Sequence, residues 1–419
     1  MNLRIGLLAA FAAAQAPASV SPDCTSPTLC DGGALPAVAA RLRSAKTGGG
    51  TVHILQIGDS HTAGDMISNG LRTRLQARYG AGGRGVLAAG RPYSGYLTWG
   101  VTASQSAGWS ANALFGRGWN GQGPALGLSG FTQTARGAGE TLALATDSPE
   151  YDFDRMTVCA LTQPGGGTVS LRLGTVVENW SLDAPTRGAA CRSLESDRPV
   201  SSAAVTTLDA GPVSITSFGT FRRAGGVVVS NLGVVGAQLQ HLGRASDTVI
   251  REELAAYRPD LILLAFGTNE GFGAGVSAAE YEAALRQQVA RIRRHAGRPV
   301  PIMLLGAPDA ASRNAAGSSC GAGWYTPIFL GEVRSIQRRV ARELGLGFWD
   351  WERAMGGRCA SQAWLGQGLM RGDMVHFTRE GGDRIGAMIF ADLERTAPAP
   401  EFVHPDPRQE PVLPIRRRP

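Results

Sequence analysis

Five short apolar stretches, each followed by a polar turn and then by a helix-like stretch, constrain the fold of this 419-residue chain more than any other feature. Repeated strand-then-helix units predict a parallel sheet with helices on both faces, because each connecting helix packs back onto the sheet. The stretches are residues 53–58, 227–233, 260–267, 301–307 and 346–351. The sequence therefore predicts an α/β fold with a doubly wound parallel sheet.

Residues typical of helix starts follow the last three strands. Ser277 and Glu280 form a capping box ahead of a helix that we expect to reach about residue 295. Thr326 precedes a proline, which favours an N-cap at Thr326 and a helix that begins at the next residue. Thr378 is the expected N-cap of a final helix that ends near Arg395.

Three positions with chemical potential lie just beyond strand ends. Ser60 follows the first strand, Gly236 follows the second and Asn269 follows the third. Ligands of open α/β sheets bind beyond the carboxyl ends of the strands. We therefore expect these three residues to lie near one another at one edge of the sheet.

A carboxylate and an imidazole three residues apart, Asp373 and His376, precede the last predicted helix. A serine hydroxyl becomes an effective nucleophile when an imidazole accepts its proton, and the imidazole needs an acid that holds its tautomer. The pattern predicts a serine-hydrolase site with Ser60 as nucleophile, His376 as base and Asp373 as the acid that orients it.

Each residue taken alone also has an ordinary structural interpretation. The alternatives are a helix cap for Ser60, a helix-start glycine for Gly236, a turn for Asn269 and a surface turn for Asp373. The polar neighbours of the motifs are expected to hydrogen-bond around the motif loops, outside the catalytic set; they are Asp59, His61 and Glu270.

Four sequence blocks in this order resemble the SGNH, or GDSL-like, hydrolases. Residues 58–61 read Gly-Asp-Ser-His, Gly236 stands alone, residues 267–270 read Gly-Thr-Asn-Glu, and residues 373–376 read Asp-Met-Val-His. The first and third blocks are similar to those of the peptidoglycan O-acetylesterases of Gram-negative periplasms. The resemblance covers roughly residues 50–90 and 225–395.

The resemblance implies a flavodoxin-like sheet and a site that needs neither cofactor nor metal. It implies that the oxyanion is held by the backbone N–H groups of Ser60 and Gly236 and by the side-chain amide of Asn269. An α/β-hydrolase is disfavoured because Thr62 stands where its G-x-S-x-G motif needs the last glycine. A two-metal phosphoesterase is disfavoured because Asp59 and His61 lack a further histidine cluster.

The segment between the first two blocks has a different character, with short apolar stretches separated by Gly, Pro, Asn and Asp. We predict that residues 91–224 are an inserted β-rich domain of the sandwich or jelly-roll kind, and that residues 19–90 and 225–396 form the hydrolase domain. Related esterases carry a carbohydrate-module-like domain here; a structural lid is the alternative. One or two of its tryptophans are expected to line a groove, among Trp99, Trp109, Trp119 and Trp180.

The start of the chain and its cysteines indicate export. Residues 1–18 resemble a signal peptide, and residues 397–419, rich in proline and arginine, are expected to be disordered. No later segment offers about 18 unbroken apolar residues, so we expect no transmembrane anchor and a soluble, periplasmic or secreted protein. Six cysteines permit a local disulfide pattern of Cys24–Cys30, Cys159–Cys191 and Cys320–Cys359, with buried free thiols as the alternative.

The net charge of +7 comes almost entirely from arginine, because Lys46 is the only lysine among 41 basic residues. The arginines are scattered over predicted helices without an aromatic-basic stripe, so we expect no nucleic-acid partner. The chain is therefore predicted to be an exported serine esterase that removes O-acetyl groups from a glycan, with the muramyl C6 position of peptidoglycan as the expected substrate. The alternatives are an O-acetyltransferase, an acetylesterase for another polysaccharide, and a catalytically silent glycan-binding protein.

Overall fold

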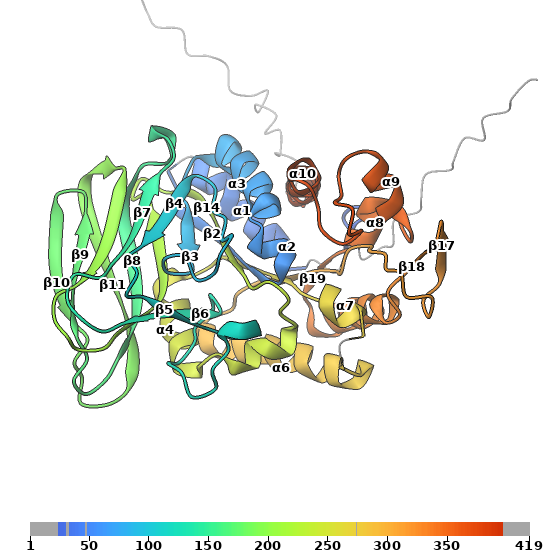
Figure 1. The fold of residues 1–419 in the computed structure, drawn as a ribbon. Coiled ribbons are helices and arrows are strands. Elements are labelled where there is room, and N and C mark those ends of the chain that lie inside the picture. Colours follow the sequence, from blue (N-terminus) through green and yellow to red (C-terminus); the bar gives the residue numbers. More distant parts are fainter. Residues whose placement is uncertain (1–23, 31–32, 47, 274, 397–419) are drawn as a thin grey trace, which may run out of the picture.

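A central, mostly parallel sheet organises the computed structural model, which describes residues 24–30, 33–46, 48–273 and 275–396 (Figure 1). The expected signal peptide and C-terminal tail lie outside the described residues. The strands run in the order β1 (Leu29–Cys30), β19 (Gly347–Trp349), β16 (Ile302–Leu305), β15 (Leu261–Ala265), β2 (Thr51–Gly58) and β14 (Gly226–Gly233). The edge strand β1 is antiparallel to β19, and the other neighbours are parallel. The five parallel strands, numbered along the chain, lie in the order 2-1-3-4-5, which confirms the predicted flavodoxin-like sheet.

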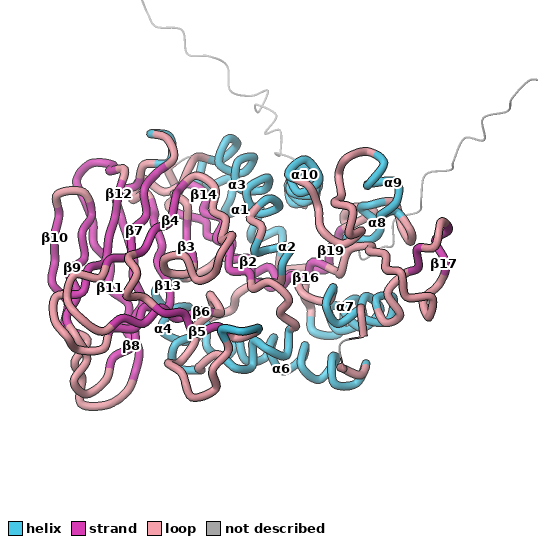
Figure 2. Tube along the Cα trace, in the orientation of Figure 1, coloured by secondary structure: helices cyan, strands magenta, loops and turns pink. Residues whose placement is uncertain are grey.

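Helices cover both faces of this sheet (Figure 2). One face packs against α1 (Leu35–Lys46), α3 (Met66–Tyr79) and α10 (Arg379–Arg395), and the other against α4 (Asp247–Tyr257), α6 (Ala278–Ala296) and α7 (Leu330–Leu344). In β2, Ile54 belongs to the buried cluster that includes α1, α3 and α10, and Leu55 belongs to the cluster that includes α4, α6 and α7. Successive side chains of a strand point to opposite faces, so a strand buried on both sides must be apolar almost throughout.

Two of the three predicted helix starts are confirmed, and one is wrong. The Ser277 hydroxyl accepts a hydrogen bond from the Glu280 N–H at 3.3 Å, and Thr378 caps α10 by accepting one from the Gly381 N–H at 3.2 Å. Thr326 caps no helix, because α7 begins at Leu330. Its N–H and hydroxyl instead bond to Ser318, where the short hairpin of β17 (Ser319–Gly321) and β18 (Trp324–Tyr325) closes.

Residues 85–221 form two antiparallel sheets beside the β14 edge of the central sheet. The first sheet contains β10 (Val176–Ser181), β9 (Thr168–Leu173), β12 (Ser202–Thr207), β7 (Thr141–Thr146) and β4 (Val101–Gln105). The second contains β11 (Gly188–Val200), β8 (Phe153–Thr162), β13 (Val213–Phe221), β6 (Phe131–Ala135) and β5 (Ser110–Ala113), with β3 (Gly85–Leu87) paired to β13. One buried apolar cluster draws its side chains from both sheets. The β-rich character predicted for this segment is confirmed, whereas its status as a separate domain stays a prediction.

The inserted strands share a core with the hydrolase helices. Both ends of the insertion meet at β14, where the Val227 N–H donates to the Gly80 carbonyl at 2.8 Å. The fully buried Glu253 of α4 accepts hydrogen bonds from the hydroxyls of Thr216 and Ser217 at 2.8 and 2.6 Å and from the Leu128 N–H at 2.6 Å. Burial raises the pKa of this carboxyl, and those three donors oppose the shift. Excision of the insertion would therefore leave the buried carboxyl group of Glu253 without these hydrogen-bond donors.

The four tryptophans of the insertion have different surroundings. Trp109 is buried in the core between the sheets, and Trp180 packs against that core. Trp119 is 37% exposed, with the Arg244 guanidinium 4.6 Å from its ring centroid. Trp99 lines a cavity that is described below.

All three predicted disulfides are present: Cys24–Cys30, Cys159–Cys191 and Cys320–Cys359. The second one joins the neighbouring strands β8 and β11 at paired positions. Among the described residues, no helix is both long and apolar enough to cross a lipid bilayer.

A buried ionic cluster joins α3 to the insertion. The carboxylate of Asp65, which is fully buried, accepts hydrogen bonds from Arg72 at 3.2 and 3.3 Å, from Arg84 at 2.7 Å and from the backbone N–H of Trp99 at 3.0 Å. Both guanidinium groups also donate to the Trp99 carbonyl, at 3.3 Å from Arg72 and 2.8 Å from Arg84. Burial alone would raise the pKa of Asp65, but the two guanidinium groups outweigh it and lower the pKa.

We predict that Asp65→Asn lowers the free energy of unfolding by about 3–5 kcal/mol, because it leaves two buried guanidinium groups without their counter-ion. The stabilisation by Asp65 is fully present above pH ~4 and is lost as the pH falls through its lowered native pKa. Glu178→Gln, which removes a half-exposed pair with Arg192, is the control and should cost at most about 1 kcal/mol. Equal losses for the two variants in urea titrations would contradict the prediction.

Candidate active site

The end of β2 presents Ser60 at the first position of the short helix α2 (Ser60–Ala63). Asp59, and not Ser60, is the N-cap, because its carboxylate accepts the His61 N–H at 2.9 Å. The strand end needs Gly58, since a Cβ there would lie 2.5 Å from the Ala265 carbonyl oxygen of β15. The Ser60 hydroxyl is therefore not used as a helix cap and is available for chemistry.

Ser60, His376 and Asp373 form a continuous hydrogen-bonded relay. The Ser60 Oγ lies 3.0 Å from His376 Nε2, and His376 Nδ1 lies 2.8 Å from Asp373 Oδ2. Nδ1 carries the proton that it donates to the carboxylate, which leaves Nε2 as the acceptor for the serine proton. The structure thus brings together the three residues that the sequence predicts as catalytic.

The loop that carries Asp373 and His376 is a tight, stiff turn. Asp373 Oδ1 accepts the backbone N–H groups of Val375 and His376, both at 2.9 Å, and Met374 adopts a left-handed backbone with φ of 58°. Burial raises the pKa of Asp373, but the hydrogen bonds from His376 and Val375 outweigh it and hold the pKa below its ordinary value. Asp373 therefore stays ionised whenever His376 acts as a base.

The second and third blocks are joined to each other. The Asn269 side-chain amide donates to the Ala237 carbonyl at 2.8 Å, so it is anchored one residue beyond Gly236. Gly236 has a φ of +75°, and a Cβ there would lie 2.7 Å from the Phe115 ring. One N–H of the Asn269 amide remains for an oxyanion, and among the described residues the Gly236 N–H has no hydrogen-bond acceptor. Their roles as oxyanion donors stay a prediction.

A cavity of about 280 Å³ opens beside the Ser60 hydroxyl. Its described lining is largely apolar and comes from α2, α3, the insertion, the loop after β14 and the loop before α10 (Arg379–Arg395); it includes Ala63, Ile67, Tyr93, Leu97, Val235 and Phe377. Leu97 and Val235 are about half exposed at the mouth. The sequence did not predict these lining residues. Only Phe377 could have been expected near the site, because it follows His376 in the sequence. The cavity suits a small acyl group with an apolar methyl end.

A buried polar network lies behind the catalytic residues. His61 Nε2 is 2.9 Å from the Val375 carbonyl, and its Nδ1 is 3.3 Å from the Asp59 carboxylate. Burial opposes the charged ring, but the hydrogen bonds to Asp59 and the Val375 carbonyl and the negative charges of Asp59 and Asp373 together outweigh burial and raise the pKa of His61. Burial, together with the nearby Asp59 charge, raises the pKa of Glu270 to about 7, although its carboxylate accepts the N–H groups of Leu239 and Gly267. The expected hydrogen bonding of Asp59, His61 and Glu270 around the motif loops is confirmed.

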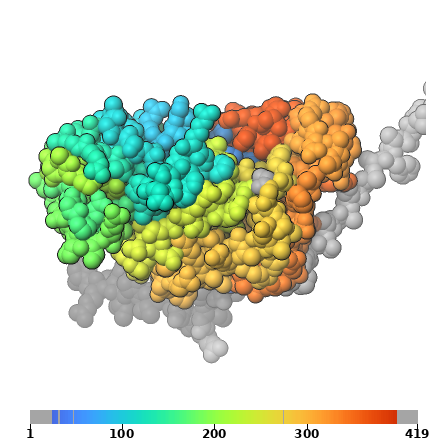
Figure 3. Space-filling view, turned by 60° about the horizontal axis from the view of Figure 1, so that its bottom comes forward, coloured from blue at the N-terminus to red at the C-terminus, as the bar shows by residue number. Residues whose placement is uncertain are grey.

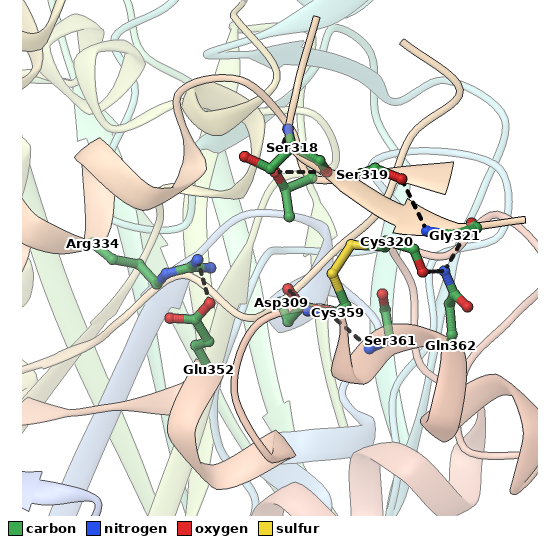
Figure 4. Close-up of a disulfide and its surroundings, with 11 residues drawn as sticks. Asp309, Ser318, Ser319, Cys320, Gly321, Arg334, Glu352, Cys359, Ser361 and Gln362 are labelled. Carbon is green, nitrogen blue, oxygen red and sulfur yellow. Dashed lines mark hydrogen bonds and ion pairs between the residues drawn. A yellow bond between two sulfur atoms is a disulfide. The ribbon is translucent and has the colours of Figure 1, made fainter. Parts of the chain in front are cut away.

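A disulfide lies in the part of the chain that precedes the catalytic loop (Figure 4). It joins Cys320 of β17 to Cys359, the residue before α9 (Ala360–Gly366). Nearby, the buried carboxylate of Asp309 accepts the N–H groups of Cys359 and Ser361 at 3.2 and 2.9 Å. Two residues after Asp309, the Ala311 N–H donates to the Met374 carbonyl at 3.0 Å. The loop that contains Asp309 and Ala311 therefore contacts both the backbone at Cys359 and the catalytic turn.

Several known proteins are similar to this chain in sequence or in fold. Residues 218–384 match the model of the GDSL-like lipase/acylhydrolase family, a range that contains Asp373 and His376. A solved structure of a peptidoglycan O-acetylesterase superposes with a TM-score of 0.73 and 29% sequence identity, over 87% of this chain and 98% of that one. Family two carbohydrate esterases from Clostridium thermocellum and Cellvibrio japonicus match at 12% and 10% identity with TM-scores of 0.28 and 0.26, over 68% and 70% of this chain and 98% of each of theirs. No curated protein sequence matches the chain.

The fold and the hydrogen bonds among Ser60, His376 and Asp373 are those expected of a serine-type ester hydrolase. Residues 218–384 are similar to the GDSL-like lipase/acylhydrolase family, as the motifs predict, and the chain is a carboxylic ester hydrolase. The family match begins at residue 218, after Ser60 and most of the inserted strands.

We predict that Ser60→Ala and His376→Ala each abolish hydrolysis of an aryl acetate while the circular dichroism spectrum stays unchanged. Asn269→Ala should reduce kcat by about 100-fold or more, as expected for the loss of one oxyanion donor. Wild-type turnover by folded Ser60→Ala protein would refute the proposed nucleophile.

His61 is expected to act by positioning the catalytic turn. His61→Ala should lower kcat for an aryl acetate by about 10- to 100-fold with little change in KM, because the Val375 carbonyl loses its donor and His376 loses its alignment. His61→Gln, whose amide nitrogen can reach the place of Nε2, should recover part of that loss. If the alanine variant keeps wild-type kcat, or if glutamine recovers nothing, His61 does not position the turn through this bond.

Proposed function

We propose that this protein is an exported esterase that removes O-acetyl groups from peptidoglycan, at the muramyl C6 position. The observation that carries the proposal is the Ser60–His376–Asp373 relay beside a small, largely apolar cavity. The similarity to a peptidoglycan O-acetylesterase over 87% of the chain supports the choice of substrate. Three disulfides among the described residues fit an oxidising compartment outside the cytoplasm.

The proposed reaction has two halves. The Ser60 hydroxyl attacks the acetyl carbonyl while His376 Nε2 accepts its proton, and the oxyanion is held by the N–H groups of Ser60 and Gly236 and by the Asn269 amide. Collapse breaks the C–O bond of the ester, and the imidazolium gives its proton to the departing sugar alkoxide. Water then attacks the acetyl-Ser60 with His376 again as base, and acetate leaves as Ser60 regains its proton.

The charge at the mouth of the cavity favours an anionic glycan. Arg371, two residues before Asp373, lines the cavity and is exposed. Its guanidinium makes no ion pair among the described residues, and no other described lining residue carries a permanent charge. Peptidoglycan bears carboxylates on its peptide branches, whereas an acetylated xylan chain is neutral. The unpaired guanidinium of Arg371 beside the ester therefore favours peptidoglycan over acetylated xylan.

We expect purified protein to release acetate from O-acetylated peptidoglycan with a kcat/KM at least tenfold above that for acetylated xylan. Arg371→Gln should narrow this preference, because the attraction to substrate carboxylates is lost. Ser60→Ala protein provides the background rate. Acetate release from xylan but not from peptidoglycan would overturn the substrate assignment, and transfer of the acetyl group to an added sugar in preference to water would identify an acetyltransferase.

A further inference from the structure

A second cavity lies next to the catalytic one. It has a volume of about 320 Å³, and Met66 belongs to the lining of both cavities. The remaining described lining residues are Asn69, Trp99, Arg379, Glu380 and Asp383. A ligand that extends from Ser60 past Met66 therefore enters a space that the catalytic relay does not use.

Three separate parts of the chain build this second cavity. Met66 and Asn69 come from the first turns of α3, and Arg379, Glu380 and Asp383 from the first turns of α10. Trp99 comes from the insertion, and the Arg379 guanidinium lies 4.4 Å from its ring centroid. In Figure 3 the teal surface of the early insertion borders the red surface of the C-terminal segments. The insertion thus supplies one wall beside the active site.

The chemistry of the lining suits a sugar ring. An indole and a stacked guanidinium offer a flat surface, and polar groups around it can bond to hydroxyl and acetamido groups. The Asn69 oxygen accepts from Arg72 at 2.8 Å, whereas its amide nitrogen donates to no described residue. The Glu380 carboxylate has neither a hydrogen bond nor an ion pair within the described parts of the chain. One donor and one acceptor thus remain for a ligand.

The backbone beneath the indole is fixed in advance. The N–H and the carbonyl of Trp99 are both held by the buried cluster of Asp65, Arg72 and Arg84. A binding surface held in this way loses little conformational entropy when a ligand arrives. An aromatic side chain that only joined two parts of the fold would not need free polar groups around it.

We propose that the second cavity is a saccharide subsite, which holds the sugar unit next to the acetylated one while the ester lies at Ser60. The inference rests on the proposed function, because it assumes that the ester is carried by a glycan. It makes Trp99 the main contact with the sugar and Glu380 a hydrogen-bond acceptor. The subsite would give the enzyme a preference for chains over single sugars.

The test compares chain lengths. Wild-type kcat/KM should be about tenfold higher for a 6-O-acetylated tetrasaccharide of alternating N-acetylglucosamine and N-acetylmuramic acid than for the 6-O-acetylated monosaccharide, a gain that corresponds to one stacked ring and its hydrogen bonds. Trp99→Ala and Glu380→Ala should each reduce this gain to threefold or less, while an aryl acetate is hydrolysed within twofold of the wild-type rate. Arg384→Ala is the matched control, because Arg384 lies on the same helix but stacks on Trp364 instead.

A binding measurement separates this inference from the esterase proposal. The unacetylated tetrasaccharide should bind to Ser60→Ala protein, and the additional Trp99→Ala or Glu380→Ala change should weaken it at least fivefold in calorimetry. Hydrolysis of mono- and tetrasaccharide esters at equal kcat/KM by wild type would overturn the subsite and leave the esterase proposal standing. Failure to cleave any glycan ester, with binding still sensitive to Trp99 and Glu380, would refute the esterase proposal alone. If the Trp99 and Glu380 variants lose kcat/KM equally on all esters, the subsite is refuted, and the Trp99–Arg379 pair only holds the insertion against α10.

Discussion

The buried carboxylate of Asp65 is the constraint on which the geometry of the site depends. It lies between the nucleophile helix α2 and helix α3, and it binds two guanidinium groups and the backbone of Trp99. A buried charge is tolerated only when oppositely charged groups and hydrogen bonds surround it. The same contacts hold the insertion against α3. Both cavities therefore have walls whose positions are set by one ionic cluster.

The catalytic turn is held by several independent bonds. Asp373 binds two backbone N–H groups of its own turn, His61 binds the Val375 carbonyl, and Ala311 binds the Met374 carbonyl. Electrostatic catalysis is effective when the donors and the base need no rearrangement during the reaction. The left-handed backbone at Met374 is held in place by these bonds. The stiffness of the turn is thus part of how the relay operates.

Local signals in the sequence predicted the structure correctly. The strand ends, the capping box at Ser277 and the pairing of His376 with Asp373 all depend on residues only a few positions apart. The helix start at Thr326 was wrong because Thr326 closes a hairpin with Ser318, an interaction that outweighs the local preference for capping. The contacts of Asp65 with Arg84 and Trp99 gave no signal in the sequence, since these partners lie 19 and 34 residues away along the chain.

The sequence by itself determined which stretches become the strands of the central sheet and which residues are the candidates for the relay, because apolar stretches bury themselves and the motifs lie where buried strands end. Only the tertiary structure decided which residues surround the substrate. Leu97, Val235 and Arg371 come from the insertion, the loop after β14 and the catalytic turn, and packing alone makes them neighbours. The same holds for Trp99, one of four tryptophans in the insertion. Its place beside Arg379 follows from a docking of sheets and helices that no short stretch of sequence specifies.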